Sequence, residues 1–160
     1  MSIAQSEQAA TIPFRHSKGT VKVCLIRRRG TEAWSLPKGC VEPGDTLPKT
    51  AIKESWEEAG LLGRLCGEPI GTYRYEKAGS VLSVVVYLME VIAHEDDWDE
   101  AEIRERRWFT LHEATELLAQ HPVQKLLPRA GALLGAAHDS WTAHDSTRAP
   151  GVIRRSSTSP

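Results

Sequence analysis

The sequence feature that most constrains the fold is the stretch SVLSVVVYLMEVIA at residues 80–93. It is apolar for most of its length, so a strand formed here has apolar side chains on both of its faces. Such strands lie in the interior of a sheet, where other elements cover both faces. The stretch therefore predicts a central strand, and the rest of the chain has to supply its neighbours and its cover.

Alternating and turn-forming residues predict the neighbouring strands. Residues 9–16 and 21–28 are expected to pair as a hairpin through the turn SKGT. Two further strands are expected at 69–77 and 106–111. Strands therefore occur on both sides of the first expected helix in the sequence.

Helical segments separate and follow these strands. The first is expected to begin after Thr46 as N-cap, to accept Pro48 in its first turn and to end at Gly60. Residues 112–120 and 122–137 have helical periodicity, with Pro128 interrupting the second segment. The order of strands, helix, strands and helix predicts an α+β fold in which helices flank a mixed sheet.

Length and composition indicate one soluble domain. The 160 residues carry a formal net charge of −1, which does not favour a nucleic acid or an anionic membrane as partner. We expect a single domain at 9–137, a flexible N-terminus at 1–8 and a disordered tail at 138–160. The tail repeats AHDS, which is also compatible with a weak metal site.

Cysteine usage and the N-terminal sequence favour the cytoplasm. The three cysteines form no C-x-x-C motif, and the first residues lack the basic and apolar regions of a secretory signal. The longest apolar run, VVVYLM, is too short to cross a bilayer. We therefore expect a reduced protein that does not span a membrane.

Three glutamates mark the first helix as chemically unusual. Glu54, Glu57 and Glu58 fall within an arc of roughly 100° around a helix. On the opposite side we expect a core-facing stripe, formed by Ile52, Ser55, Trp56 and Ala59. Crowded carboxylates repel one another unless a cation lies among them, and Mg²⁺ prefers such oxygen ligands.

The loop before the helix strengthens the metal interpretation. Pro37 and Pro43 restrict the backbone on either side of Gly39, whose lack of a side chain allows close approach. A stiff loop of this kind can hold a backbone carbonyl next to the carboxylates. The alternative is a solvated acidic face on which Lys53 offsets Glu57.

Residues 39–61, GCVEPGDTLPKTAIKESWEEAGL, resemble the Nudix box G-x5-E-x7-R-E-U-x-E-E-x-G-U, in which U is a bulky aliphatic residue. Three positions differ: Asp45 replaces Glu, Lys53 replaces Arg and Ser55 replaces the aliphatic residue. In the family the first two positions brace the loop and helix and do not bind metal. Flanking segments resemble the diphosphoinositol polyphosphate phosphohydrolase-like branch and its bacterial relatives.

The resemblance implies a Nudix-type α/β/α sandwich and metal-dependent hydrolysis of a phosphoanhydride by water, with Mg²⁺ or Mn²⁺ as cofactor. It implies that the metal ligands are Gly39, Glu54, Glu57 and Glu58. The catalytic base is expected to be Glu57 or Glu54, with Glu102 and Glu105 as further candidates outside the box. The substrate is expected to be a small phosphorylated molecule, and the protein a monomer or a homodimer.

Cationic side chains are candidates for binding the substrate's phosphates. They are Arg15, Arg27, Arg28, Arg29, Lys38, Arg74 and Arg106. The stretch KAGSVLS has Ser80 near a position where the inositol-pyrophosphate enzymes carry a basic residue, which favours a less charged substrate such as a dinucleoside polyphosphate. Tyr73, Tyr75 and Trp98 are candidates for stacking on a base.

Two alternatives remain open at this stage. A non-catalytic Nudix-fold sensor of a nucleotide or ADP-ribose would keep the fold, although the intact glutamates argue against it. An RNA 5′ pyrophosphohydrolase would favour a basic groove, which the net charge does not indicate.

Overall fold

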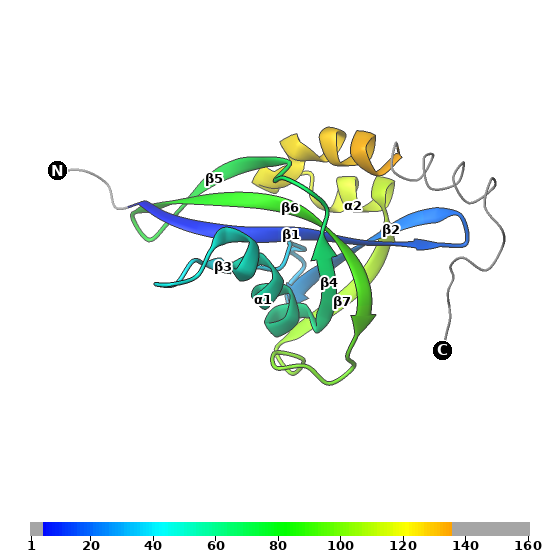
Figure 1. The fold of residues 1–160 in the computed structure, drawn as a ribbon, viewed down its shortest axis with the longest axis horizontal. Coiled ribbons are helices and arrows are strands. Elements are labelled where there is room, and N and C mark those ends of the chain that lie inside the picture. The colour runs from blue at the N-terminus through cyan, green and yellow to red at the C-terminus, as the bar shows by residue number, and fades with distance from the viewer. Residues whose placement is uncertain (1–4, 136–160) are drawn as a thin grey trace. The chain divides into compact units, whose positions relative to one another are not determined.

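The structure is a computed structural model that describes residues 5–135 (Figure 1). Its strands are β1 (Gln5–Ser17), β2 (Thr20–Arg28), β3 (Lys38–Cys40), β4 (Leu61–Leu65), β5 (Gly71–Lys77), β6 (Ser80–His94) and β7 (Arg104–Thr110). Its helices are α1 (Leu47–Ala59), α2 (Leu111–Leu117) and the 3₁₀ helix η1 (Pro122–Leu126). Residues 127–135 are also helical. The chain divides into two units, Met1–Leu127 and Pro128–Pro160.

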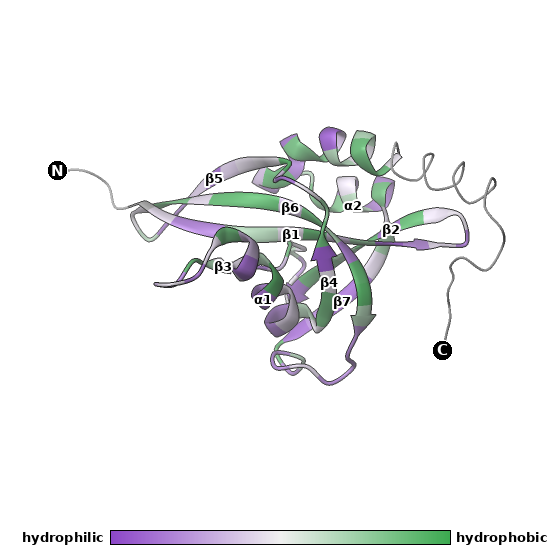
Figure 2. Cartoon of the chain, viewed as in Figure 1, coloured by the Kyte–Doolittle hydropathy of each residue, from purple (hydrophilic) through white to green (hydrophobic). Residues whose placement is uncertain are grey.

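Strand β6 is the centre of the sheet, as its apolar sequence predicts. It runs parallel to β1 and antiparallel to β4 and β5, while β2 and β7 extend the sheet beyond β1. Figure 2 shows that most of β6 is hydrophobic, and Val84, Val86 and Met89 are fully buried. The sheet is mixed, so the predicted fold class is confirmed.

The β1–β2 hairpin is present, but β1 is longer than expected. Lys18 and Gly19 both have positive φ, which gives a tight turn whose twist suits a hairpin. Strand β1 begins at Gln5, so residues 5–8 are not the flexible start that the sequence predicts. The reason is tertiary, because these polar residues pair with β6 from Val81 to Val84. The predicted tail at 138–160 lies outside the described residues.

Helices cover both faces of the sheet within the first unit. Helix α1 packs against β1 on one face, while α2 and η1 lie on the other (Figure 1). The last helical segment is divided close to Pro128, as the sequence predicts: η1 ends at Leu126 and a separate helix begins at residue 127, with Pro128 in its first turn, where proline is tolerated. In the part of the chain that the structure describes, no helix is long and apolar enough to cross a membrane.

Helix α1 has the predicted ends but a different buried face. Thr46 caps its N-terminus by accepting from the Lys49 N–H, and Gly60 adopts a left-handed conformation at its C-terminus. Trp56, expected in the core, is 38% exposed, which contradicts the prediction. Ser55 and Ala59 are buried as predicted, and Ala51 joins them in the sheet-facing stripe, whose small side chains let the helix approach β1 closely.

A buried hydrogen bond joins α1 to β1. The hydroxyl oxygens of Thr11 and Ser55 are 2.8 Å apart, and both residues are fully buried. Ser55 donates to the Ala51 carbonyl oxygen, so Thr11 donates to Ser55. The serine at the box's aliphatic position therefore makes a polar contact between helix and sheet in place of an apolar one.

Removing this hydrogen bond tests its contribution to the fold. Ser55→Ala should lower the free energy of unfolding by about 1–3 kcal/mol, because it leaves the Thr11 hydroxyl buried without its partner. The double variant Thr11→Val/Ser55→Ala should be less destabilised than the sum of the two single variants. Urea denaturation of the four proteins measures both quantities, and strict additivity would show that the two hydroxyls are not coupled.

Candidate active site

Strand β3 brings the loop of the box against α1. It pairs with β1 at Ala9 and Ala10, on the strand against which α1 packs. Gly39 consequently faces the Glu54 side chain, and a Cβ atom added at Gly39 would lie 2.2 Å from the Glu54 carboxyl carbon. The Glu54 carboxylate occupies the space that a side chain at position 39 would need, and the predicted proximity of Gly39 to the helix glutamates is present for Glu54.

Glu58 is the most firmly held of the three glutamates. One carboxylate oxygen accepts from the Lys38 backbone N–H at 3.1 Å, and the other accepts from Arg104 at 3.3 Å. Only 13% of its side chain is exposed. Glu58 lies about 60° around the helix from buried Ser55, so it borders the sheet-facing stripe. The acidic and buried faces of α1 are therefore adjacent, whereas the sequence pattern predicts them back to back.

Crowding of negative charge defines the electrostatics of the site. Burial, together with the nearby Glu58 and Glu57 carboxylates, raises the pKa of Glu54 from its usual range to about 7. Burial also raises the pKa of Glu58, against the lowering effects of the Lys38 N–H and Arg104. These carboxylates are placed where a cation would relieve their repulsion.

A fourth carboxylate, Glu100, belongs to this cluster and was missed in the sequence. Its charge contributes to the raised pKa of both Glu54 and Glu58, and Arg104 binds Glu100 at 2.5 Å as well as Glu58. The outside candidates lie elsewhere: Glu102 is exposed, and Glu105 pairs with Arg27 and Arg107. No local motif marks Glu100, because only the fold brings its loop to α1.

The two charged substitutions in the box still pair with each other. Lys53 contacts Asp45 at 3.0 Å and Glu42 at 3.3 Å, which ties α1 to the preceding loop. The pKa of Lys53 rises to about 12 and that of Asp45 falls, chiefly through their mutual hydrogen bond. The brace that the resemblance implies is therefore present with a shorter acid and a lysine.

Lys38 is the predicted phosphate ligand that lies next to the glutamates. Its backbone N–H binds Glu58, while its ammonium group donates to the Tyr75 hydroxyl at 2.8 Å. Tyr75 in turn donates to Gln8 at 3.0 Å. Because Tyr75 is a neutral partner, this contact orients the ammonium group without cancelling its charge.

The other predicted cations have structural contacts of their own. Arg15 stacks over Trp108 and lies five residues along β1 from the Lys38 partner, about 17 Å at the rise of a strand. Arg27 pairs with Glu105, and Arg29 donates to the Ala101 carbonyl oxygen. Arg28 and Arg74 are exposed, the latter beside a polar recess formed with Ser6, Glu7 and Ser83. The structure thus does not gather these cations around the box.

Arg106 and Trp98 hold the C-terminal end of α1. Arg106 donates to the Ala59 carbonyl oxygen at 2.6 Å and stacks over the Trp98 ring, and the Trp98 indole N–H donates to the Glu58 carbonyl oxygen at 2.9 Å. A cation at a helix C-terminus is favourable. Of the three aromatic residues considered for base stacking, Tyr73 is 1% exposed and is not accessible to a ligand.

The oxygen atoms at this site suit Mg²⁺ or Mn²⁺ better than a metal that takes all of its ligands from the protein. Among residues 5–135, no group of three His, Cys, Asp or Glu side chains is placed to hold a metal ion by itself. Mg²⁺ usually takes one or two carboxylates together with waters and substrate phosphates. Crowded, partly desolvated glutamates beside a glycine backbone provide this incomplete shell.

The raised pKa of Glu54 predicts a pH-dependent stability in chelator. A carboxyl whose pKa is raised on folding stabilises the fold below its ordinary pKa, and that stability is lost as pH rises through about 7. Glu54→Gln should therefore raise Tm at pH 8 and have a smaller effect at pH 5. Differential scanning calorimetry measures this, with the exposed Glu76→Gln as control. Equal shifts at both pH values would contradict the crowding.

Comparison with known proteins places this geometry in a family. The NUDIX domain profile matches residues 6–130. Nudix hydrolase 12, mitochondrial, of Arabidopsis thaliana is 32% identical over 79% of this chain and 65% of its own length. Diphosphoinositol polyphosphate phosphohydrolase 3-alpha of Homo sapiens is 27% identical over 72% of this chain and 70% of its own. The chain spans 56% of Nudix hydrolase 4 of Arabidopsis thaliana, so it matches little more than half of that relative.

Solved structures agree with the observed architecture. The binary complex of the C. elegans Ap4A hydrolase superposes with a TM-score of 0.72 at 24% identity, covering 82% of this chain and 98% of that one. A NUDIX hydrolase from Nitrosomonas europaea superposes with a TM-score of 0.63 at 22% identity, over 80% of this chain and 89% of its own. The fold, the glycine–glutamate geometry and the profile agree, and the chain belongs to the Nudix family.

Proposed function

We propose that this protein hydrolyses a phosphoanhydride bond in a small phosphorylated substrate. The observation that carries the proposal is that Glu54 lies against Gly39 while Glu58 accepts from the adjacent Lys38 backbone N–H, which creates a cluster of carboxylates with raised pKa. The family supports a hydrolase, and the relatives that match include proteins named for diphosphoinositol polyphosphates and for Ap4A. The proposed location is the cytoplasm, and a monomer or homodimer is compatible with the proposal.

The proposal assigns a role to each residue at the site. Gly39, Glu54, Glu57 and Glu58 would hold Mg²⁺ or Mn²⁺, with Glu100 as an added ligand or hydrogen-bond acceptor for bound water. When bound, the ion supplies charge neutralisation at phosphate and a lowered pKa of water. Lys38 binds a substrate phosphate, because Tyr75 orients its ammonium group and the charge of that group acts on Glu58, whose pKa it lowers.

Glu54 and Glu57 remain the proposed catalytic bases. A general base works best when its pKa is near the working pH, and burial together with the neighbouring carboxylates brings the pKa of Glu54 to about 7. Glu57 is half-buried beside it, whereas Glu58 is held by two hydrogen bonds from Lys38 and Arg104. These contacts suit Glu58 to binding a metal and leave proton transfer to its neighbours.

A substrate panel tests the reaction itself. Diadenosine polyphosphates, nucleoside triphosphates, ADP-ribose and diphosphoinositol polyphosphates are assayed for phosphate release with Mg²⁺, with Mn²⁺ and with chelator. We expect metal-dependent turnover of one class, and a loss of at least a hundredfold in Glu58→Gln with unchanged circular dichroism. Nucleotide binding without turnover of any substrate would instead support the sensor. Near-normal turnover in Glu58→Gln would refute the assignment of Glu58.

Gly39→Ala tests the contact between loop and helix more locally. The added methyl group has to displace the Glu54 carboxylate, which is the flexible end of a side chain, so Tm should change by only a few degrees. Turnover should fall at least a hundredfold, because a metal ligand is moved. Gly135→Ala is the matched control, since a Cβ atom there meets nothing within 4 Å. A full loss of folding, or unchanged turnover, would contradict this account.

A further inference from the structure

Four side chains on the face of the sheet opposite α1 form a directed chain of hydrogen bonds. The Lys38 ammonium group donates to the Tyr75 hydroxyl at 2.8 Å, and Tyr75 donates to the Gln8 side-chain oxygen at 3.0 Å. The Gln8 amide nitrogen then donates to the Cys40 sulfur atom at 3.5 Å. The fold assembles this chain across the adjacent strands β5, β6, β1 and β3, so no sequence motif contains it.

Gln8 is the member of this chain that only tertiary pairing places. It belongs to residues 5–8, which the sequence predicts as a flexible start, and it pairs with β6 and with Cys40 of β3. Ala9 packs against α1, so the alternating side chain of Gln8 points to the other face of the sheet. Only 7% of Gln8 is exposed, so its amide has to make its hydrogen bonds inside the protein.

The direction of the hydrogen bonds determines how Tyr75 meets Lys38. A tyrosine hydroxyl has one proton to donate, and Gln8 accepts it, so the lone pairs of the Tyr75 oxygen are free to accept from Lys38. The Cys40 sulfur atom accepts from the amide nitrogen of Gln8, which leaves the amide oxygen facing Tyr75. Without an acceptor at position 8 the hydroxyl proton would have no fixed direction, and Lys38 would lose a fixed partner.

The surroundings leave the charge of Lys38 available to a ligand. Tyr75 uses one of the three ammonium protons, and its ring centroid lies 4.9 Å from the ammonium nitrogen. In the part of the chain that the structure describes, no carboxylate forms an ion pair with Lys38. Burial and the charge of Lys38 lower the pKa of His121 to about 4, so this neighbour is neutral at pH 7.

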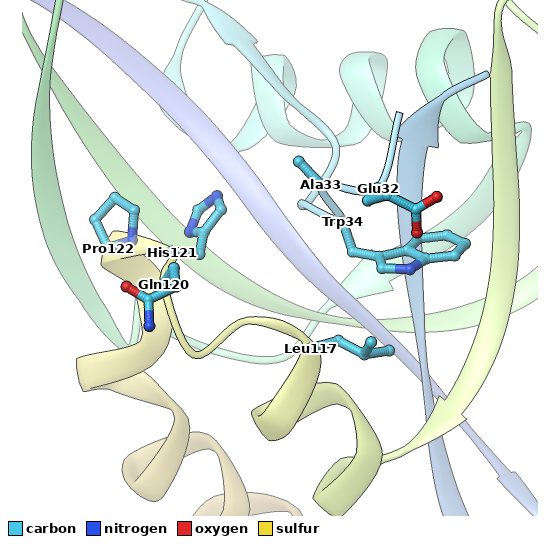
Figure 3. Close-up of a pocket in the computed structure, with 7 residues that line it drawn as sticks. All are labelled: Glu32, Ala33, Trp34, Leu117, Gln120, His121 and Pro122. Atoms are coloured by element: carbon cyan, nitrogen blue, oxygen red, sulfur yellow. The ribbon is translucent and has the colours of Figure 1, made fainter. Parts of the chain in front are cut away.

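His121 connects these neutral surroundings to a pocket of about 400 Å³. Figure 3 shows His121 on one side of this pocket and Glu32 on the other. Glu32 is the only acidic residue among the seven that line the pocket, and it pairs with Arg27 at 3.6 Å. The pocket lining therefore provides no unpaired carboxylate that would compete with a phosphate for Lys38.

We propose that Gln8 is a positioning residue for phosphate binding: it fixes the Tyr75 hydroxyl, which holds the Lys38 ammonium group in place for a phosphate of the substrate. The inference rests on the proposed function, because Lys38 is assigned there to a substrate phosphate. A lysine side chain loses much rotamer freedom when it binds a ligand. Tyr75 and Gln8 restrict that freedom in advance, so less is lost on binding, and two ammonium protons remain for phosphate oxygens.

Binding of methylenediphosphonate tests the role of Gln8 without turnover, because its P–C–P link cannot be hydrolysed. Isothermal titration calorimetry with Mg²⁺ measures its dissociation constant for the wild-type protein, Gln8→Met, Lys38→Met and the double variant. Methionine has nearly the length of glutamine, but its sulfur atom is only a weak acceptor. Gln124→Met is the matched control, because Gln124 is exposed on η1.

We expect Gln8→Met to raise the dissociation constant at least fivefold in the wild-type background and less than twofold in the Lys38→Met background. Lys38→Met alone should raise it at least tenfold, and Gln124→Met should not change it. An effect of Gln8→Met that persists without Lys38 would show that Gln8 supports the fold and not the ammonium group. That result, an unchanged constant in Gln8→Met, or a wild-type protein that does not bind at millimolar concentration would overturn the proposal.

Tyr75→Phe removes the hydroxyl through which Gln8 acts and keeps the ring. It should weaken binding about as much as Gln8→Met, and the two changes together should weaken it no further. Additive losses would show that Gln8 acts by another route and would overturn the proposal. Because Tyr75→Phe leaves the Gln8 side chain intact, the comparison with and without Lys38 is made with this variant if Gln8→Met does not fold.

Turnover separates this inference from the proposed function. With the substrate class that the panel identifies, Gln8→Met should raise KM about fivefold and change kcat less than threefold, because Lys38 holds the phosphate in the bound state and in the transition state alike. If an anhydride is hydrolysed but KM is unchanged in Gln8→Met, the reaction stands and the role of Gln8 is wrong. If diphosphonate binding depends on Gln8 through Lys38 but no anhydride is hydrolysed, the positioning role stands and the catalytic proposal fails.

Discussion

Repulsion among the carboxylates of α1 is the constraint on which the site depends. Glu54 and Glu58 are partly removed from water and lie near one another, which is unfavourable for two charged groups. The fold imposes this arrangement through contacts on the other side of the helix. The Thr11–Ser55 hydrogen bond and the small side chains of the buried stripe hold α1 against β1, the strand that also positions Gly39. These packing contacts thus keep the carboxylates close together despite their mutual repulsion.

Much of this arrangement is predictable because local signals coincide with it. Thr46 and Gly60 mark the ends of α1, and the apolar run at 80–93 identifies the central strand. The prediction that Trp56 is buried is wrong. A large aromatic residue suggests a core position, whereas close packing of this helix on the sheet favours small residues. Strands β3 and β4 are short and contain glycine, so neither has a recognisable strand pattern. Their positions depend on pairing with β1 and β6, which are distant in sequence.

Residues that lie far from the box in sequence but contact α1 in the fold are a second group that no motif predicts. Arg104 binds both Glu58 and Glu100, so one guanidinium links the helix to the loop before β7. Arg106 and Trp98 hold the end of the same helix. The sequence identifies Arg106 as a cation but not its role, because a role in helix capping requires knowledge of the pairing between β2 and β7. The cations chosen by charge alone are therefore scattered over the fold, whereas Gly39 and the glutamates of the box lie close together.

The most direct test of the central claim is anomalous diffraction from crystals grown with Mn²⁺. The account predicts a manganese peak within coordination distance of the Glu54 and Glu58 carboxylates and the Gly39 carbonyl oxygen, and loss of that peak in Glu58→Gln. Manganese bound only elsewhere on the protein, under conditions that support turnover, would contradict the claim that the crowded glutamates form the metal site.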